Sequence, residues 1–229
     1  MCIRDSSGTS VTNKLIGNSG ANTMTSFGGS DRLEGAAGND TYVINPGDVI
    51  VDTAGTDTVK TSLLSLNLAT LAGGKLENAT LTGASAFSLD GNAGANTLIG
   101  NAAANRINGK EGKDILTGAA GNDTFIFNTK LSAASNADRI TDFSVPNDIF
   151  HLENSGAGMF TGLANGVLSA ARFAANATGT ATEADDRIVY NKTTGDLFFD
   201  SNGDAAGGAI KFATLANKAA LTAADFFII

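Results

Sequence analysis

The sequence has little of the residues on which several common functions depend. Its 229 residues include one cysteine, one histidine, two prolines and no tryptophan. One cysteine allows no internal disulfide and no cysteine-ligated zinc site, and a single histidine leaves little room for histidine-based catalysis. No apolar run reaches the about 18 residues that a membrane-spanning helix needs. The sequence therefore predicts neither a disulfide scaffold nor a helical membrane protein.

Basic residues are also scarce. The chain has 15 Lys and Arg against 23 Asp and Glu, which gives a net charge of −8. Nucleic-acid binding needs basic patches, so this balance argues against it. Only 17% of the residues are charged, whereas 28 of the 229 residues are glycine. Low charge combined with abundant Gly, Asn and Thr indicates an ordered, turn-rich β protein rather than a disordered chain.

Two blocks of the sequence repeat with a period of nine residues. The first begins at Gly8 and reads GTSVTNKLI, GNSGANTMT, SFGGSDRLE, GAAGNDTYV; the second begins at Gly91 and reads GNAGANTLI, GNAAANRIN, GKEGKDILT, GAAGNDTFI. The blocks share the order Asn, Asn, Asp, Asp at position six, which indicates an internal duplication. Position eight is always apolar and is occupied by Leu15, Met24, Leu33, Tyr42, Leu98, Ile107, Leu116 and Phe125.

A period of nine fits a short strand followed by a tight turn, with two repeats in each coil of a flattened solenoid. Position eight would point into the core. Glycine at positions one and four permits positive φ in the turn. Asn or Asp at position six lies where short polar side chains bond the local backbone. The position-six residues are Asn13, Asn22, Asp31, Asp40, Asn96, Asn105, Asp114 and Asp123.

This pattern resembles the RTX, or haemolysin-type, calcium-binding repeat, whose consensus is G-G-x-G-x-D-x-U-x. The resemblance implies an all-β fold, a right-handed parallel β-roll in two repeat blocks. It also implies that Ca²⁺ lies between turns stacked on the same side, held by position-six carboxylates and turn carbonyls. Asn replaces Asp in the first two repeats of each block. Those early turns are therefore consistent either with weaker calcium sites or with metal-free turns.

A fifth turn of each block can be read with an insertion, at Asp57 and at Asp138. If alternate turns share a side of the roll, turn three stacks on turn five. This pairs Asp31 with Asp57 and Asp114 with Asp138, the two all-carboxylate pairs and the strongest candidate calcium sites. The other stacks pair an Asn with an Asp, and Asn supplies an oxygen without charge. The resulting candidate metal ligands are Asp31, Asp40, Asp57, Asp114, Asp123, Asp138, Asn13, Asn22, Asn96 and Asn105.

The domain organisation follows from these blocks. The first six residues, MCIRDS, resemble the translation of a transposase adapter used in DNA library preparation. We therefore expect residues 1–7 to lie outside the fold, and the chain to be the C-terminal fragment of a longer protein. The remaining expected units are a first roll block at 8–61, a β spacer continuing the solenoid at 62–90, a second block with a closing cap at 91–152 and a small, separate C-terminal β module at 153–229.

The segment after Asp138, DRITDFSVPNDIFHL, resembles the closing element of the roll in serralysin-type proteases. Its acids Asp142 and Asp148 either join the last calcium corner or are solvated turn residues. The loop Asp200–Asp204 has oxygen ligands at alternate positions, but Lys211 stands where an EF-hand needs Glu, so an acidic hairpin turn is favoured over a lone calcium loop.

The C-terminal residues LTAADFFII resemble the uncleaved signal read by type I secretion systems. Thr222 and Asp225 predict a capping box. An edge strand that closes the C-terminal module is the alternative interpretation of the same residues, and it is compatible with the first.

Together these resemblances imply a secreted, extracellular calcium-binding module of a Gram-negative bacterium. Extracellular Ca²⁺ would drive its folding, and the module would support type I export and stability of a missing upstream domain. The expected partners are calcium ions and, through the C-terminus, the secretion machinery. No enzymatic activity is expected within this chain, which lacks H-E-x-x-H. The alternative is a surface adhesion or glycan-binding module. Such a module would be expected to expose aromatic platforms, but the chain has no Trp and its only Tyr residues are Tyr42 and Tyr190.

Overall fold

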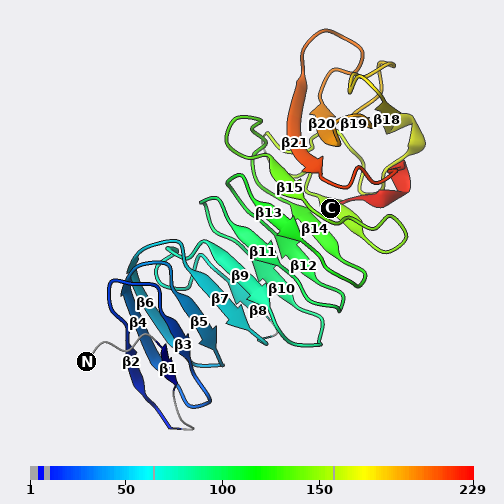
Figure 1. The fold of residues 1–229 in the computed structure, drawn as a ribbon. Coiled ribbons are helices and arrows are strands. Elements are labelled where there is room, and N and C mark those ends of the chain that lie inside the picture. Colours follow the sequence, from blue (N-terminus) through cyan, green and yellow to red (C-terminus); the bar gives the residue numbers. More distant parts are fainter. Residues whose placement is uncertain (1–4, 8–10, 64, 157) are drawn as a thin grey trace.

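The computed structural model describes residues 5–7, 11–63, 65–156 and 158–229. Regular structure in these residues is almost entirely β, with two single 3-10 turns, Ala170–Arg172 and Ala223–Asp225. No helix in the described part of the chain is long and apolar enough to cross a membrane. Figure 1 shows an elongated stack of short strands that runs from the N-terminus to a more irregular C-terminal part.

Successive strands of the repeats alternate between two faces of this stack. The first face is one sheet of twelve strands. In spatial order it contains β1 (Asp5–Ser7), β3 (Thr23–Thr25), β5 (Thr41–Ile44), β7 (Thr58–Thr61), β9 (Asn78–Leu81), β11 (Thr97–Ile99), β13 (Ile115–Thr117), β15 (Asp138–Ile140), β21 (Ala209–Leu215), β20 (Asp196–Asp200), β19 (Ile188–Asn191) and β18 (Phe173–Asn176).

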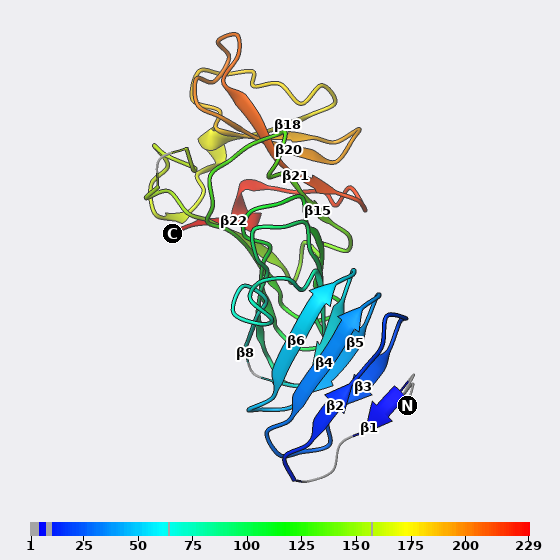
Figure 2. The ribbon, with the colours of Figure 1, turned by 90° about the vertical axis from the view of Figure 1, so that its left-hand side faces the viewer.

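The second face is divided into two sheets, and Figure 2 shows the smaller one, near the N-terminus, beside β3 and β5. The smaller sheet contains β2 (Lys14–Ile16), β4 (Arg32–Ala37) and β6 (Val49–Ala54). The larger one contains β8 (Ser65–Asn67), β10 (Ser88–Asp90), β12 (Arg106–Asn108), β14 (Thr124–Phe127), β16 (Ile149–Leu152), β22 (Phe226–Ile228) and β17 (Gly166–Val167).

The register confirms the predicted parallel β-roll with two nonapeptides in each coil. Strands β3 and β5 pair in parallel with Thr23 opposite Thr41, and β11 and β13 pair with Leu98 opposite Leu116. Both offsets are 18 residues, or two repeats. The fold is therefore an all-β parallel roll, as the period of nine predicts.

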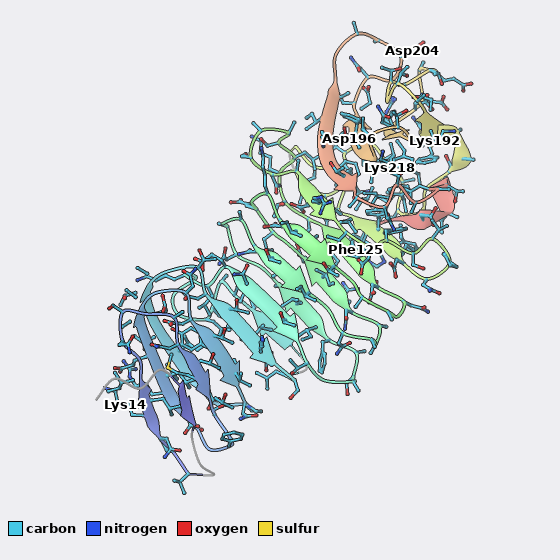
Figure 3. All side chains as sticks on the ribbon, in the orientation of Figure 1. Lys14, Phe125, Lys192, Asp196, Asp204 and Lys218 are labelled. Carbon is cyan, nitrogen blue, oxygen red and sulfur yellow. The ribbon has the colours of Figure 1, made fainter. Side chains whose placement is uncertain are left out.

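Position eight forms the core, because alternate residues of a strand point to opposite faces and only one face is covered. Leu15 is 4% exposed, and the position-eight residues of the other seven repeats are fully buried. Phe125, labelled in Figure 3, belongs to this row. At the C-terminal end of the row Phe150 stacks between Phe143 and Phe226, with ring centroids 4.6 and 4.9 Å away. These rings fill the end of the roll.

One repeat, which is half a coil, was missed in the sequence. Strand β6 pairs in parallel with β4 and places Ile50, which is 4% exposed, in the core row. Asp48 is thus the fifth turn of the first block and Asp57 is the sixth. The repeat that contains Asp48 is one residue short and includes Pro46 instead of the usual glycine pattern. That deletion hid the period.

Both ends of the chain differ from the expected units. Asp5–Ser7, expected to lie outside the fold, form β1 and pair with β3; residues 1–4 are outside the described part. The C-terminal segment is not separate from the roll, since β21 pairs with β15 and β22 with β16. Strand β22 lies between β16 and β17, so it is an internal strand rather than an edge strand. The remaining unit boundaries stay predictions.

Candidate calcium-binding corners

Each position-six residue ends the turn that leads into a strand, and we call it a corner. Because strands alternate between the faces, the corners form one column along each edge of the roll. The column that precedes the first sheet contains Asn22, Asp40, Asp57, Glu77, Asn96, Asp114 and Asp138. The column on the opposite edge contains Asn13, Asp31, Asp48, Asn105, Asp123 and Asp148.

Hydrogen bonds join neighbouring corners within each column. The backbone N–H of one corner donates to a side-chain oxygen of the next corner along the chain, at 2.7–3.1 Å. The pairs on the first edge are Asn22–Asp40, Asp40–Asp57, Asp57–Glu77, Asn96–Asp114 and Asp114–Asp138. The pairs on the second edge are Asn13–Asp31, Asp31–Asp48, Asn105–Asp123 and Asp123–Asp148.

This geometry settles the predicted stacking. The four Asn–Asp stacks and the Asp114–Asp138 stack are present. The Asp31–Asp57 stack is wrong, because Asp31 lies on the other edge and donates to Asp48. The missed repeat shifts the count by one turn and moves Asp57 to the edge of Asp40. Asp148 is a true corner, whereas Asp142 accepts hydrogen bonds from the N–H groups of Gly118 and Ala119.

Five corner carboxylates each have a buried oxygen without a hydrogen-bond partner in the described part of the chain. In each, Oδ1 accepts the N–H of the preceding corner and Oδ2 accepts nothing, although every one of these residues is only 1% exposed. A buried carboxylate oxygen without a partner is costly. An oxygen-seeking cation such as Ca²⁺ removes that cost. The five residues are Asp31, Asp40, Asp57, Asp114 and Asp123.

Glycine at position one leaves room beside the Oδ2 atoms of Asp40, Asp114 and Asp123. A Cβ on Gly109 would overlap Oδ2 of Asp114, and a Cβ on Gly118 would overlap Oδ2 of Asp123. Position-four glycines approach backbone carbonyls of the turn one coil earlier, as Gly112 approaches the carbonyl oxygen of Gly94. Carboxylate and carbonyl oxygens are the ligands that Ca²⁺ prefers. The Asp corners therefore fit the ion that the sequence implies.

The Asp turns also have a distinct backbone. Position two is left-handed at Ala36, Lys110 and Ala119, with φ of 75°, 73° and 71°. A left-handed non-glycine residue costs about 1–2 kcal/mol, and such strain persists where the surroundings require it. The Asn turns 17–22, 91–96 and 100–105, all within the described residues, contain no positive φ.

The Asn turns bond their own backbone instead. Oδ1 of Asn96 accepts the N–H of Asn92, and Oδ1 of Asn105 accepts that of Asn101, both at 2.8 Å. Nδ2 of Asn92 donates to the carbonyls of Gly74 and Leu76, one coil earlier, at 3.1 and 2.7 Å.

Asn101 repeats this arrangement on the carbonyls of Gly83 and Ser85, at 2.7 and 3.0 Å. In each case an amide group occupies turn carbonyls that face the following coil. The Asn96 and Asn105 corners are thus satisfied without a metal ion, which favours the metal-free interpretation for them.

Burial perturbs the corner acids strongly. Desolvation raises the pKa of Asp57, Asp114 and Asp123 to about 7, and that of Asp138 to about 8. For Asp138 the neighbouring carboxylate of Asp114 adds to the effect. Burial also raises the pKa of Asp40 and Asp148. Without a cation these side chains resist ionisation, so calcium must displace protons to bind them.

Sequence reasoning missed three acids at these columns, Asp48, Asp52 and Glu77. Asp48 and Glu77 each stand two residues before a buried apolar residue, Ile50 and Ala79, and that spacing could have identified them. Asp52 stands at position one, where the pattern led us to expect glycine.

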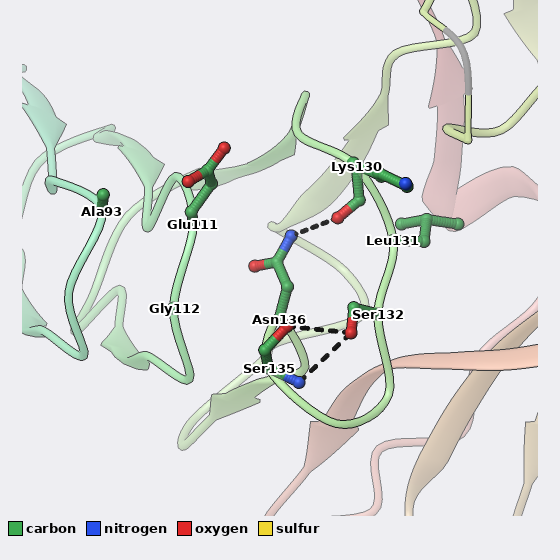
Figure 4. A pocket seen from close by; sticks show the side chains of 8 residues that line it. All are labelled: Ala93, Glu111, Gly112, Lys130, Leu131, Ser132, Ser135 and Asn136. Atoms are coloured by element: carbon green, nitrogen blue, oxygen red, sulfur yellow. Dashed lines mark hydrogen bonds between the residues drawn. The ribbon is translucent and has the colours of Figure 1, made fainter.

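Two features outside the corners are a surface pocket and a hairpin loop. Figure 4 shows a pocket of about 420 Å³ with Glu111 and Lys130 on its rim, where Ser135 and Ser132 bond each other. The loop after Asp200 joins β20 and β21 as an antiparallel hairpin, and Asp204 lies near its tip in Figure 3.

Comparisons with known proteins bear on the repeats. The family model of the RTX calcium-binding nonapeptide repeat (4 copies) matches residues 7–42 and 90–125. No curated protein matches the chain. Among solved structures, the chain is similar to the AlgE6R3 subunit of the Azotobacter vinelandii mannuronan C5-epimerase, at 20% identity over 96% of this chain and 79% of that one. The TM-score is 0.24. The two matched segments are the blocks whose turns form the corners described above, and the chain therefore contains two blocks of RTX calcium-binding nonapeptide repeats.

Proposed function

We propose that the chain is a secreted calcium-binding module whose roll is completed by Ca²⁺ at the Asp corners. The supporting observation is the set of buried, unpartnered Oδ2 atoms. Each belongs to a side chain that its neighbours already hold in place, so the ligand is oriented before the ion arrives. Asp31, Asp40, Asp57, Asp114 and Asp123 are the proposed ligands on this ground. Asp138 joins them through its bond from Asp114.

We assign the Asn corners a structural role. Asn96 and Asn105 use Oδ1 within their own turns, so that oxygen already accepts a hydrogen bond where a cation would need it. Asn22 has the same Oδ1 bond, to the N–H of Asn18. Asn13 is grouped with them by its place in the repeat.

Calcium dependence of folding follows from charge. Stacked, buried carboxylates repel one another in the absence of a cation, and anything that binds only the folded state stabilises it. Titration of Ca²⁺ into chelated protein should increase the β signal in circular dichroism and raise the melting temperature. An unchanged spectrum and melting temperature at millimolar calcium would refute the proposed function.

Such coupling suits export through a narrow channel. Free calcium is low in a bacterial cytoplasm, and extracellular calcium modules bind in the range of about 10⁻⁴–10⁻³ M. The module would then leave the cell unfolded, fold outside it and stabilise an upstream domain. The C-terminal strand β22 is the proposed address for a type I secretion system.

The burial of strand β22 determines how the proposed address can be tested. Phe226 and Ile228 are fully buried, whereas Phe227 is 36% exposed. The address would therefore be read before the C-terminal part folds. Deletion of Asp225–Ile229 should keep the protein inside cells that carry a type I system. Phe227→Ser, which spares the buried residues, should have the same effect if the sequence itself is read. Secretion of both variants at the undeleted level would refute the address but not the calcium sites.

A further inference from the structure

Three carboxylates meet at one corner of the first edge. One oxygen from each of Asp40, Asp52 and Asp57 lies within 4.8 Å of the other two. The three residues are 1%, 6% and 1% exposed. Asp40 and Asp57 are corners of consecutive coils, whereas Asp52 occupies position one of the repeat whose position six is Asp57. Position one is glycine in the Asp40 and Asp114 turns of the same edge, at Gly35 and Gly109.

Each carboxylate has one oxygen held by the protein. Oδ1 of Asp40 accepts the N–H of Asn22 at 2.8 Å, and Oδ1 of Asp57 accepts the N–H of Asp40 at 2.7 Å. Oδ1 of Asp52 accepts the hydroxyl of Tyr42 at 2.7 Å. The Oδ2 atoms of Asp40 and Asp57 are buried and accept no hydrogen bond in the described part of the chain. They are free to bind a ligand inside the cluster.

We propose that Asp40, Asp52 and Asp57 form a three-carboxylate cation site, in which Asp52 replaces the glycine of the repeat and Tyr42 orients it. This proposal rests on the proposed function, because it extends calcium binding at the Asp corners. It assigns to Asp52 and Tyr42 roles that the repeat pattern does not contain.

The geometry selects the kind of ion. Calcium–oxygen distances of about 2.3–2.6 Å place ligand oxygens up to about 5 Å apart across the ion, which accommodates the 4.8 Å limit of this cluster. Mg²⁺ demands a tighter octahedron and dehydrates reluctantly. Three charges instead of the two of an ordinary Asp corner favour Ca²⁺ and, still more, a trivalent lanthanide of similar size. This corner should therefore be the tightest site of the first block.

Tyr42 supplies a local reporter. A tyrosine ring sensitises the luminescence of Tb³⁺ only at short range, and the chain has no tryptophan. The other tyrosine, Tyr190, lies in β19 of the C-terminal part. Tyrosine-excited emission during a Tb³⁺ titration of the chelated full chain thus reports on this corner, while calorimetry reports on all corners.

Substitutions at Asp52, Tyr42 and Asp48 distinguish the proposed ligand, the reporter and a control. Asp52→Asn retains an oxygen for the Tyr42 hydroxyl but removes one charge, and it should weaken Tb³⁺ and Ca²⁺ binding at this corner about tenfold or more. Tyr42→Phe should lose the emission and retain most of the binding heat. Asp48→Asn, which removes one charge on the opposite edge, is the matched control and should leave the emission titration unchanged. Asp52→Gly restores the repeat residue and provides a second variant if Asp52→Asn fails to fold.

The outcomes are separable. No sensitised emission from wild-type protein, while calorimetry shows calcium at other corners, would overturn this site and leave the proposed function standing. Emission that titrates identically in wild type, Asp52→Asn and Asp52→Gly would show that Asp52 is not a ligand. An absence of calcium binding by calorimetry at any corner would instead refute the proposed function. Weakened binding in both Asp52 variants, with an unchanged Asp48→Asn control, would support the proposal.

Discussion

Replacing Asp123 with asparagine should stabilise the metal-free protein while removing a calcium site. Asp123 is 1% exposed, its Oδ1 accepts the N–H of Asn105, and its Oδ2 has no hydrogen-bond partner in the described residues. Burial raises the pKa of this carboxyl from 3.8 to about 7. Asn keeps the oxygen that Asn105 needs and has no charge to desolvate. An ordinary structural aspartate would instead lose stability on this change.

The magnitude follows from linkage between protonation and folding. A group whose folded pKa lies above its unfolded value destabilises the fold progressively as pH rises between the two values. For Asp123 this window runs from 3.8 to about 7. At about 1.4 kcal/mol for each pKa unit, ionised Asp123 costs about 4 kcal/mol at pH 8 and less than about 1 kcal/mol at pH 4. Asp123→Asn should therefore gain up to about 4 kcal/mol at pH 8, in chelator, and little at pH 4.

Urea denaturation in chelator at pH 8 and pH 4 measures this difference, and a calcium titration at pH 8 completes the assay. Calcium should stabilise wild type more than Asp123→Asn. The difference in free energy of unfolding between the two proteins should therefore narrow or change sign as calcium is added. Asp142→Asn is the matched control, since it removes one charge at the same end of the roll. Its two oxygens accept the N–H groups of Gly118 and Ala119 at 3.0 and 2.8 Å, so it should lose stability. Equal destabilisation of both variants at pH 8 would refute the reasoning.

Further predictions concern the turns and the pH. Gly118→Ala should abolish the calcium-dependent rise in melting temperature from the Asp123 corner, because the Cβ would fill the space beside Oδ2; Gly94→Ala, at a position where Ala103 stands in the next turn, should leave that rise unchanged. Asn92→Ala should cost about 1–3 kcal/mol in urea denaturation, equally with and without calcium, because it removes amide bonds to two carbonyls; a loss that calcium reverses would contradict a metal-free turn. Asp114→Ala should reduce calcium affinity in calorimetry more than Asn96→Ala, and equal effects would contradict the assignment of corners. Calcium affinity should rise from pH 5 to pH 8 with release of protons, because the pKa values of Asp57, Asp114 and Asp123 lie near 7 and that of Asp138 near 8; calorimetry in buffers of different ionisation enthalpy tests this, and a flat pH profile would count against it.

The roll could be predicted because its determinants are periodic and local. A buried position eight and a polar position six every nine residues specify a strand, a turn and an inward side, and the register of 18 residues follows. The Asn–Asp stacks followed from the same arithmetic. Where the period slips by one residue, at the turn of Asp48, the assignment of Asp57 to an edge failed. A columnar fold propagates a counting error along the chain even when each individual turn is identified correctly.

Features that depend on distant partners could not be predicted. Strand β22 pairs with β16, more than seventy residues earlier in the chain, and no local pattern specifies that neighbour. Asp52 joins its cluster because the roll brings position one beside two corners, and the repeat pattern assigns that position to glycine. Asp52 is therefore visible in the sequence only as a departure from the pattern. The Thr222–Asp225 capping box, by contrast, is local and is confirmed.

The order Asn, Asn, Asp, Asp has a structural consequence that neither residue type has alone. Two turns make one coil, so each block starts with a coil whose corners are both Asn and continues with a coil whose corners are both Asp. The Asn coil needs no ion at Asn96 and Asn105, since its amides bond the backbone. Its N–H groups at Asn96 and Asn105 then donate to Oδ1 of Asp114 and Asp123.

A hydrogen bond to a charged acceptor contributes about 1.5–3 kcal/mol, and here it also fixes the rotation of the carboxylate. The metal-independent coil therefore orients the ligands of the metal-dependent coil that follows. In each block a second Asp coil follows the first, and the N–H groups of the first Asp coil donate to its carboxylates in the same way. Placing an Asn coil first in each block gives the calcium-dependent turns an edge on which to assemble, and the duplication of the block repeats that arrangement further along the roll.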